Sequence, residues 1–242
     1  VDAAAELNKP PAHYGIVLRG SSGSEYIWQG ILAGQGGKYF DEKYEPQLNS
    51  VEAVRATDIY CNKLLRQSGP PGAANYDWYA CQQLFAGGKA AMFIDSTYFG
   101  AVNQDSKLSQ VVGKTGNLPL PKGWNSGMWF GALAIPAKAK NPKAAWLFIE
   151  WANAPETFWK VLKIAPMCIV ARTGFFTDPA TKPEFQRVQN LPDDWFTAAI
   201  DSLEKARNYR PMVPELSEIA DIIEKTGLAD VIAGADAKPI MD

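Results

Sequence analysis

The chain has 242 residues, of which 47% are hydrophobic and 21% are charged, a composition typical of folded globular proteins rather than disordered ones. Its formal net charge of −2 argues against nucleic acid or an anionic membrane surface as the main partner, because both attract basic surfaces. The single histidine and three cysteines match no zinc-binding spacing, so we expect no metal and no cofactor.

Short apolar runs alternate with helical patterns along the first half of the chain. Residues 14–18 (YGIVL) predict a buried strand, and a Gly/Ser loop leads from it to a helix with Ser24 as its expected N-cap. A second helix is predicted over residues 51–67, where Ser50 is the expected N-cap.

A third helix is predicted after Asp77, its expected N-cap, and AAMFID at residues 90–95 predicts a second buried strand. Two strands separated by helices indicate a βαβ arrangement with a parallel sheet, so the expected fold class is α/β. A third strand is predicted at residues 132–136 (ALAIP). Asn141 and Pro142 then mark the start of a strongly periodic helix.

Aromatic residues flank the ends of these predicted strands, where open α/β sheets place their ligands. A flat ring can pack against the C–H face of a sugar or polyol, while nearby polar groups bind its hydroxyls. Core packing is the alternative for each ring, and for Tyr26 and Trp28 the two interpretations are equally consistent with the sequence. The candidate ligand-binding residues are Ser24, Glu25, Tyr26, Trp28, Tyr98, Trp129, Phe130 and Gly131.

No catalytic motif is present: the chain contains no G-x-S-x-G sequence, no P-loop and no G-x-G-x-x-G after a strand. Two carboxylates among Glu25, Asp41, Asp95 and Glu215 would suit glycoside hydrolysis if the fold brought them together, although most acidic residues are solvated surface. We therefore expect no enzyme and no catalytic residues, and keep a carbohydrate-active enzyme as an alternative.

Longer motifs follow one another in a recognisable order. They are YGIVLRG, a helix ending in GQGG, SVEAVRATDIYCNKLLRQSGPPGA, LFAGGKAAMFIDSTYFG, LPLPKG and WFGALAIPAKAKNPKAAWLFIEWANAPE. In this order they resemble the bacterial extracellular (periplasmic) solute-binding proteins of ABC importers, and within them the large class that binds carbohydrates and polyols.

The resemblance implies the type II periplasmic-binding-protein architecture, in which two α/β lobes enclose the solute. On that plan the chain lacks most of the first lobe. Residues 1–127 belong to the second (C-terminal) lobe, residues 128–176 cross back to the first lobe, and residues 177–242 return to the second. The resemblance also adds Arg172 to the ligand-binding residues.

The function implied by the resemblance is capture of a sugar or sugar alcohol in the interlobe cleft and its delivery to permease subunits in the membrane. The same architecture could instead bind a peptide, a polyamine or an anion. The implied location is the periplasm, or the cell surface as a membrane-anchored lipoprotein. In that oxidising compartment Cys61 and Cys81 could form a disulfide.

Overall fold

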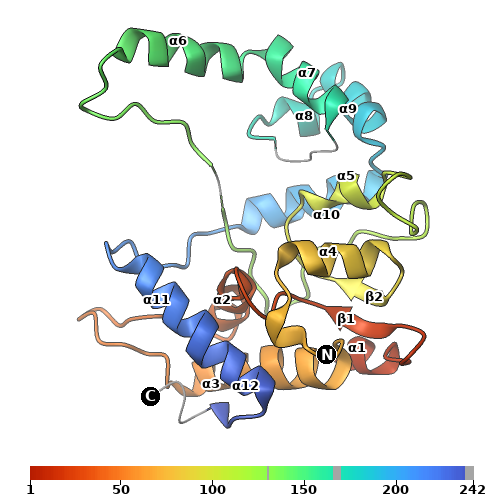
Figure 1. Ribbon diagram of the computed structural model, residues 1–242, viewed down its shortest axis with the longest axis vertical. Coiled ribbons are helices and arrows are strands. Elements are labelled where there is room, and N and C mark those ends of the chain that lie inside the picture. The colour runs from red at the N-terminus through yellow and green to blue at the C-terminus, as the bar shows by residue number, and fades with distance from the viewer. Residues whose placement is uncertain (130, 166–169, 238–242) are drawn as a thin grey trace.

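The computed structural model describes residues 1–129, 131–165 and 170–237. The described chain forms an elongated molecule whose two-stranded sheet lies among helices toward one end, while α6, α7, α8 and α9 (within residues 142–164 and 174–189) lie at the other end (Figure 1). The strands are β1 (Tyr14–Val17) and β2 (Ala90–Phe93). The α-helices are α1 (Asp2–Glu6), α2 (Ser24–Gly34), α3 (Val51–Thr57), α4 (Trp78–Ala86), α5 (Phe99–Asn103), α6 (Pro142–Asn153), α7 (Pro155–Ile164), α8 (Gly174–Thr177), α9 (Thr181–Gln189), α10 (Asp193–Lys205), α11 (Leu216–Ile222) and α12 (Ala229–Ala233). Two π-helices, η1 (Asp58–Arg66) and η3 (Ile223–Leu228), and one 3₁₀-helix, η2 (Ala73–Asn75), complete the described elements.

The two predicted strands pair in parallel, as the βαβ pattern predicts. Ile16 lies opposite Met92, and Val17 lies opposite Phe93. The third predicted strand is wrong: residues 132–136 form no strand, and Leu133 is 56% exposed. The ALAIP segment has no neighbouring strand among the described residues, and an apolar run without a pairing partner gains no ladder hydrogen bonds.

Two predicted helix caps are confirmed. The Ser50 hydroxyl accepts a hydrogen bond from the Ala53 N–H at 3.2 Å, and the Asp77 carboxylate accepts one from the Ala80 N–H at 2.8 Å. The predicted helix over residues 51–67 is also present, although it changes from α-helix to π-helix at Asp58. These features depend on local sequence, which explains why they are predictable.

The predicted cap of α2 is wrong. Gly23 is the N-cap in a left-handed conformation (φ 81°), and Ser24 is the first helical residue. Ser24 is completely buried, and Glu25 lies in the first turn, where a carboxylate is favoured by the helix dipole.

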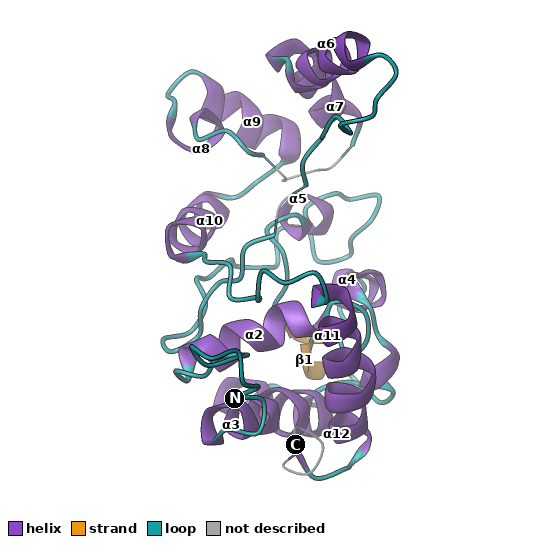
Figure 2. Cartoon of the chain, turned by 90° about the vertical axis from the view of Figure 1, so that its left-hand side faces the viewer, coloured by secondary structure: helices purple, strands orange, loops and turns teal. Residues whose placement is uncertain are grey.

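Three apolar clusters hold the described chain together. The largest joins α1, β1, α2, α3, η1, η3 and α12, and Figure 2 shows α2, α3 and α12 gathered around β1. A small cluster lies between β1, α4 and β2, and another joins α5 to α7, α8, α9 and α10. By contrast, α6 has no buried residue, and its Trp146, Phe148 and Trp151 are 54–60% exposed.

The disulfide that the resemblance left open does not form, because Cys61 and Cys81 are both free. Cys61 lies in the largest cluster, whereas Cys81 lies between α4 and the sheet. Burial raises the pKa of the Cys61 thiol, and it raises the pKa of the Cys81 thiol to about 12. Both side chains are therefore neutral core residues at neutral pH.

Trp28 provides a test of the largest cluster. Its ring is fully buried, packs edge-on against Tyr39 and donates its indole N–H to the Thr57 hydroxyl at 3.0 Å. We expect Trp28→Ala to lower the free energy of unfolding by about 3–5 kcal/mol in urea denaturation, because it leaves a large cavity and an unpaired hydroxyl. The control Leu118→Ala removes a side chain that is 87% exposed. A Trp28→Ala effect as small as that of the control would contradict this account of the core.

Candidate functional site

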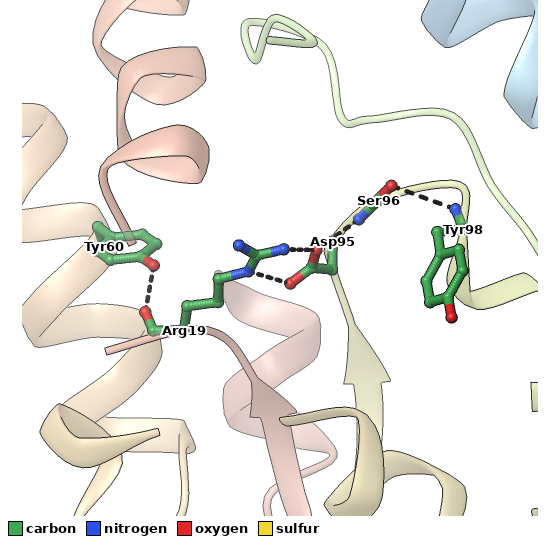
Figure 3. A network of polar contacts seen from close by, with 5 residues as sticks. All are labelled: Arg19, Tyr60, Asp95, Ser96 and Tyr98. Carbon is green, nitrogen blue, oxygen red and sulfur yellow. Dashed lines mark hydrogen bonds and ion pairs between the residues drawn. The ribbon is translucent and has the colours of Figure 1, made fainter. Parts of the chain in front are cut away.

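The loops that follow the two parallel strands are joined by one buried ion pair. Arg19 comes two residues after β1 and Asp95 two residues after β2, and the guanidinium binds the carboxylate in a fork through Nε at 2.6 Å and Nη2 at 2.5 Å (Figure 3). The Arg19 and Asp95 side chains are only 17% and 2% exposed. Burial alone would lower the pKa of Arg19, but the hydrogen bonds and charge of Asp95 outweigh it and raise that pKa. The Arg19 guanidinium therefore stays charged, and its fork onto Asp95 fixes the spacing of the two loops.

The loop after β2 is ordered by further hydrogen bonds that lead to Tyr98. The Ser96 N–H donates to Asp95 at 2.7 Å, and the Tyr98 N–H donates to the Ser96 hydroxyl at 3.2 Å (Figure 3). From the other side, the Trp195 indole donates to the Thr97 carbonyl at 3.3 Å. The half-buried Tyr98 ring is thus held on a short, constrained loop at the carboxyl end of the sheet.

A second buried ion pair lies at the start of α2. The Glu25 carboxylate is fully buried, and its Oε2 lies 3.1 Å from Nε of Arg210. These two atoms form no directional hydrogen bond, so the contact is ionic. Glu25 also accepts a hydrogen bond from the Tyr39 hydroxyl, and its backbone N–H donates to Glu224 at 3.2 Å.

The environment of Glu25 disfavours its charge. Burial raises the pKa of Glu25 from 4.5 to about 7, against the opposing effect of Arg210 and with a smaller raising contribution from Glu224. Burial also raises the pKa of Glu224. Burial is the main cause in both carboxyl groups and outweighs the opposing charge of Arg210, which explains why both hold their protons more tightly than in water.

Tyr26 contacts the same arginine. Nη1 of Arg210 donates to the Tyr26 hydroxyl at 2.8 Å, and the guanidinium carbon lies 4.4 Å from the centre of the ring. Sequence reasoning missed Arg210, since it is 184 residues from Tyr26 and sits in an irregular segment between α10 and α11 with no helical or strand period.

Helix α2 also supports the segment that leads out of this part of the molecule. The Asn125 N–H donates to the Gly30 carbonyl at 3.0 Å. A Cβ at Gly30 would collide with the Asn125 carbonyl oxygen, and a Cβ at Gly34 would collide with that of Gly123. Only glycine allows this backbone contact. Next to it, Gly127 forms a parallel bridge with Arg207, which donates to Ser126 and accepts from Met128 at 3.1 Å each.

The structure brings together only some of the predicted site residues. Trp129 follows this bridge directly and is 64% exposed, whereas Trp28 belongs to the core and offers no ring surface to a solute. The hydroxyl of Ser24 is buried without a hydrogen-bond partner. Arg172 lies apart from these residues, where its Nη2 donates to the Asn153 carbonyl at the end of α6 at 2.6 Å.

The remaining two predicted site residues, Phe130 and Gly131, directly precede the ALAIP segment. Gly131 is exposed, and a Cβ added to it would meet no atom within 4 Å, so no close approach is visible there among the described residues. Phe130 lies outside the described residues.

Neither a metal cluster nor a membrane-spanning helix is found in the described parts of the chain. No group of three or more His, Cys, Asp or Glu residues there could hold an ion, and no helix there is long and apolar enough to cross a bilayer. One hollow, about 460 Å³ in volume, lies against α6 and is lined by Pro142, Lys143, Trp146 and Leu147.

The raised pKa of Glu25 predicts a pH dependence of stability. Between pH 4.5 and about 7 the unfolded chain releases this proton while the folded chain retains it, so the free energy of unfolding should fall as pH rises, by up to about 3 kcal/mol. Glu224 should add to the fall, because its pKa is raised as well. We expect Glu25→Gln to reduce the slope in urea denaturation at pH values of about 5 to about 8.

The control for this measurement is Glu184→Gln on α9. An exposed arginine, Arg187, lowers the pKa of Glu184, so Glu184 does not titrate in this pH range. An unchanged slope in Glu25→Gln would contradict the assignment of the raised pKa to Glu25.

Comparisons with known proteins identify the family of this chain. Residues 1–157 match the model of the family described as bacterial extracellular solute-binding protein. The chain is 35% identical over 159 residues to a mannitol-binding protein of Pseudomonas aeruginosa, an alignment that covers 62% of this chain and 36% of the relative.

Solved structures resemble the whole described fold. A solute-binding protein of an ABC transporter from Agrobacterium radiobacter K84, in complex with ribitol, has a TM-score of 0.78 and 28% identity, with 100% of this chain and 60% of that chain covered. A second, from Agrobacterium vitis S4 with bound D-mannitol, has a TM-score of 0.76 over 99% of this chain and 61% of that chain, and at 24% identity it shows the fold alone. This chain therefore spans about three fifths of these structures and about one third of the curated relative.

The expected α/β fold of solute-binding proteins is confirmed by these matches. The family model alone covers well over half of the chain, which also places the protein in an extracytoplasmic family of binding proteins. The chain belongs to the bacterial extracellular solute-binding protein family.

Proposed function

We propose that this protein is the receptor of an ABC importer, and that it captures a sugar or sugar alcohol in a cleft between two lobes. One observation carries the proposal: the buried Arg19–Asp95 pair joins the loops at the carboxyl ends of β1 and β2, which lead to Tyr26 and Tyr98. Aromatic rings on loops at this edge of a parallel sheet are suited to pack against the C–H face of a polyol.

The paired charges near these rings favour a neutral solute. Arg19 contacts the buried Asp95 and Arg210 contacts the buried Glu25, and all four side chains are at most 17% exposed, so little of either charge is presented to an anion or a polyamine. Ribitol, bound by the similar protein of Agrobacterium radiobacter, and mannitol, bound by the similar protein of Pseudomonas aeruginosa, support the same class of solute. The proposed ligand-binding residues are Tyr26, Tyr98, Trp129, Phe130, Gly131 and Arg172, with Ser24 and Glu25 behind the first ring.

The lobes are proposed from the apolar clusters. Residues 1–127 and 177–242 form one lobe in this proposal, since α3 packs in the same cluster as α12. The cluster of α5 and α10 also contains α7 and α8, so it joins this lobe to the crossing segment. Residues 128–176 cross to the other lobe. The exposed apolar side chains of α6 support this crossing, because large exposed residues such as Trp146, Phe148 and Trp151 are typical of a surface that another part of a protein covers.

The proposed mechanism is closure without chemistry. Solute bridges the two lobes, the crossing segments absorb the rotation, and the closed form docks on the permease subunits in the membrane, with the protein in the periplasm or anchored at the cell surface. Hydrolysis of a glycoside would need one carboxyl group as an acid and another as a nucleophile or base. Glu25 and Asp95 are instead engaged by Arg210 and Arg19, which supports a receptor rather than an enzyme.

The site assignment is tested with the full-length protein. Tryptophan fluorescence is titrated with D-mannitol, ribitol and maltose, and we expect Tyr98→Ala and Trp129→Ala each to weaken binding about tenfold by removing a ring contact. The control Tyr44→Ala removes a ring that is 72% exposed on the loop before α3 and should leave affinity unchanged. If both Tyr98→Ala and Trp129→Ala kept the wild-type affinity for these solutes, neither ring would take part in binding.

A further inference from the structure

We propose that Arg210 is a positioning residue for Tyr26, and that its guanidinium holds the ring in the orientation that the solute meets. The inference rests on the proposed function, in which Tyr26 forms part of the solute-binding wall. It assigns Arg210 a role in solute recognition that does not require Arg210 to touch the solute.

Arg210 restrains the Tyr26 ring in two directions. The hydrogen bond from Nη1 to the hydroxyl, at 2.8 Å, fixes the far end of the ring, and the guanidinium carbon, 4.4 Å from the ring centre, covers one face. Together the two contacts occupy the hydroxyl end and one face of the ring. The ring therefore has one covered face, and its rotation about the side-chain bonds is restricted.

Arg210 is itself held on its other side. Nε lies 3.1 Å from the fully buried Glu25, which is in turn bound by Tyr39 and by a backbone contact to Glu224. A buried carboxylate without a cation is costly, so the pair resists separation. The guanidinium of Arg210 thus lies between the Glu25 carboxyl group and the Tyr26 ring.

The backbone around Arg210 is also anchored. Its N–H donates to the Asn208 side chain at 3.2 Å, and Arg207 bridges Gly127 on the segment that runs toward Trp129. The arginine that orients Tyr26 is therefore three residues from the point where the chain leaves for the proposed first lobe. Because the Arg210 side chain is only 16% exposed, it has little surface for solute, and its influence must pass through the ring.

Lysine cannot reproduce this arrangement. The planar guanidinium reaches Glu25 with one nitrogen and the Tyr26 hydroxyl with another, whereas an ammonium is a single point charge. Arg210→Lys keeps the charge next to Glu25 and so protects the fold, yet it should release the ring. It serves as the second variant in case Arg210→Gln is too unstable to study.

The first measurement needs no ligand. The full-length protein is labelled with 3-fluorotyrosine, and the Tyr26 signal is assigned by its absence in Tyr26→Phe. We expect the ¹⁹F signal of Tyr26 to narrow and to move toward the position of free fluorotyrosine in Arg210→Gln and Arg210→Lys. The control Arg187→Gln removes an exposed arginine of α9 and should leave the signal in place. An unchanged Tyr26 signal in a folded Arg210 variant would overturn the proposal.

The second measurement links the ring to binding. By calorimetry with D-mannitol, ribitol and maltose, we expect Arg210→Gln to weaken binding at least about fivefold, and the double variant Tyr26→Ala/Arg210→Gln to bind within about twofold of Tyr26→Ala alone. Effects that multiply would mean that Arg210 acts independently of the ring, which overturns the proposal. If the wild-type protein binds none of the three probes, the proposed polyol function fails, while the ¹⁹F measurement still decides the role of Arg210.

Discussion

The backbone contact between α2 and the segment 123–127 is the constraint on which the rest of the site depends. Gly30 and Gly34 have no side chains, so residues 123–125 lie directly on the helix. This close approach puts Gly127 beside Arg207 and therefore sets the path of residues 206–210 over the start of the same helix. Helix α2 thus positions the chain that runs toward Trp129 and also the Arg210–Glu25 ion pair beside Tyr26. Through these two contacts, Gly30 and Gly34 determine the shape of the proposed solute-binding wall.

Features that arise from neighbouring residues are the ones that the sequence analysis predicted well. The strands predicted at residues 14–18 and 90–95 are dense in apolar residues and followed by polar loops, and they pair in parallel as the intervening helices require. The caps at Ser50 and Asp77 depend on a side chain three positions before the N–H that it accepts. Pro142 marks the first residue of α6 because its missing N–H costs nothing there. The resemblance to the family could also be seen in the sequence, because it rests on long continuous motifs that follow one another in a fixed order along the chain.

Features that arise from distant contacts were missed or misassigned. ALAIP has the composition of a strand, but a strand also needs a neighbour, and none lies beside it in the described structure. The helical period could not distinguish a ring that contacts a ligand from one that packs in the core. Trp28 was therefore a candidate for ligand binding, although it lies in the largest apolar cluster. Cys61 and Cys81 share inward stripes but face different clusters. Arg210 could not be found at all, since its role depends on a charge and a ring almost the length of the chain away.

A crystal structure of the full-length protein grown with D-mannitol or ribitol tests the central claim most directly. The account predicts that the polyol lies between two lobes, with the rings of Tyr26 and Tyr98 on one wall and the chain past Gly127 crossing to the other. A polyol bound elsewhere, with both rings packed inside the protein and no groove shared between them, would contradict it.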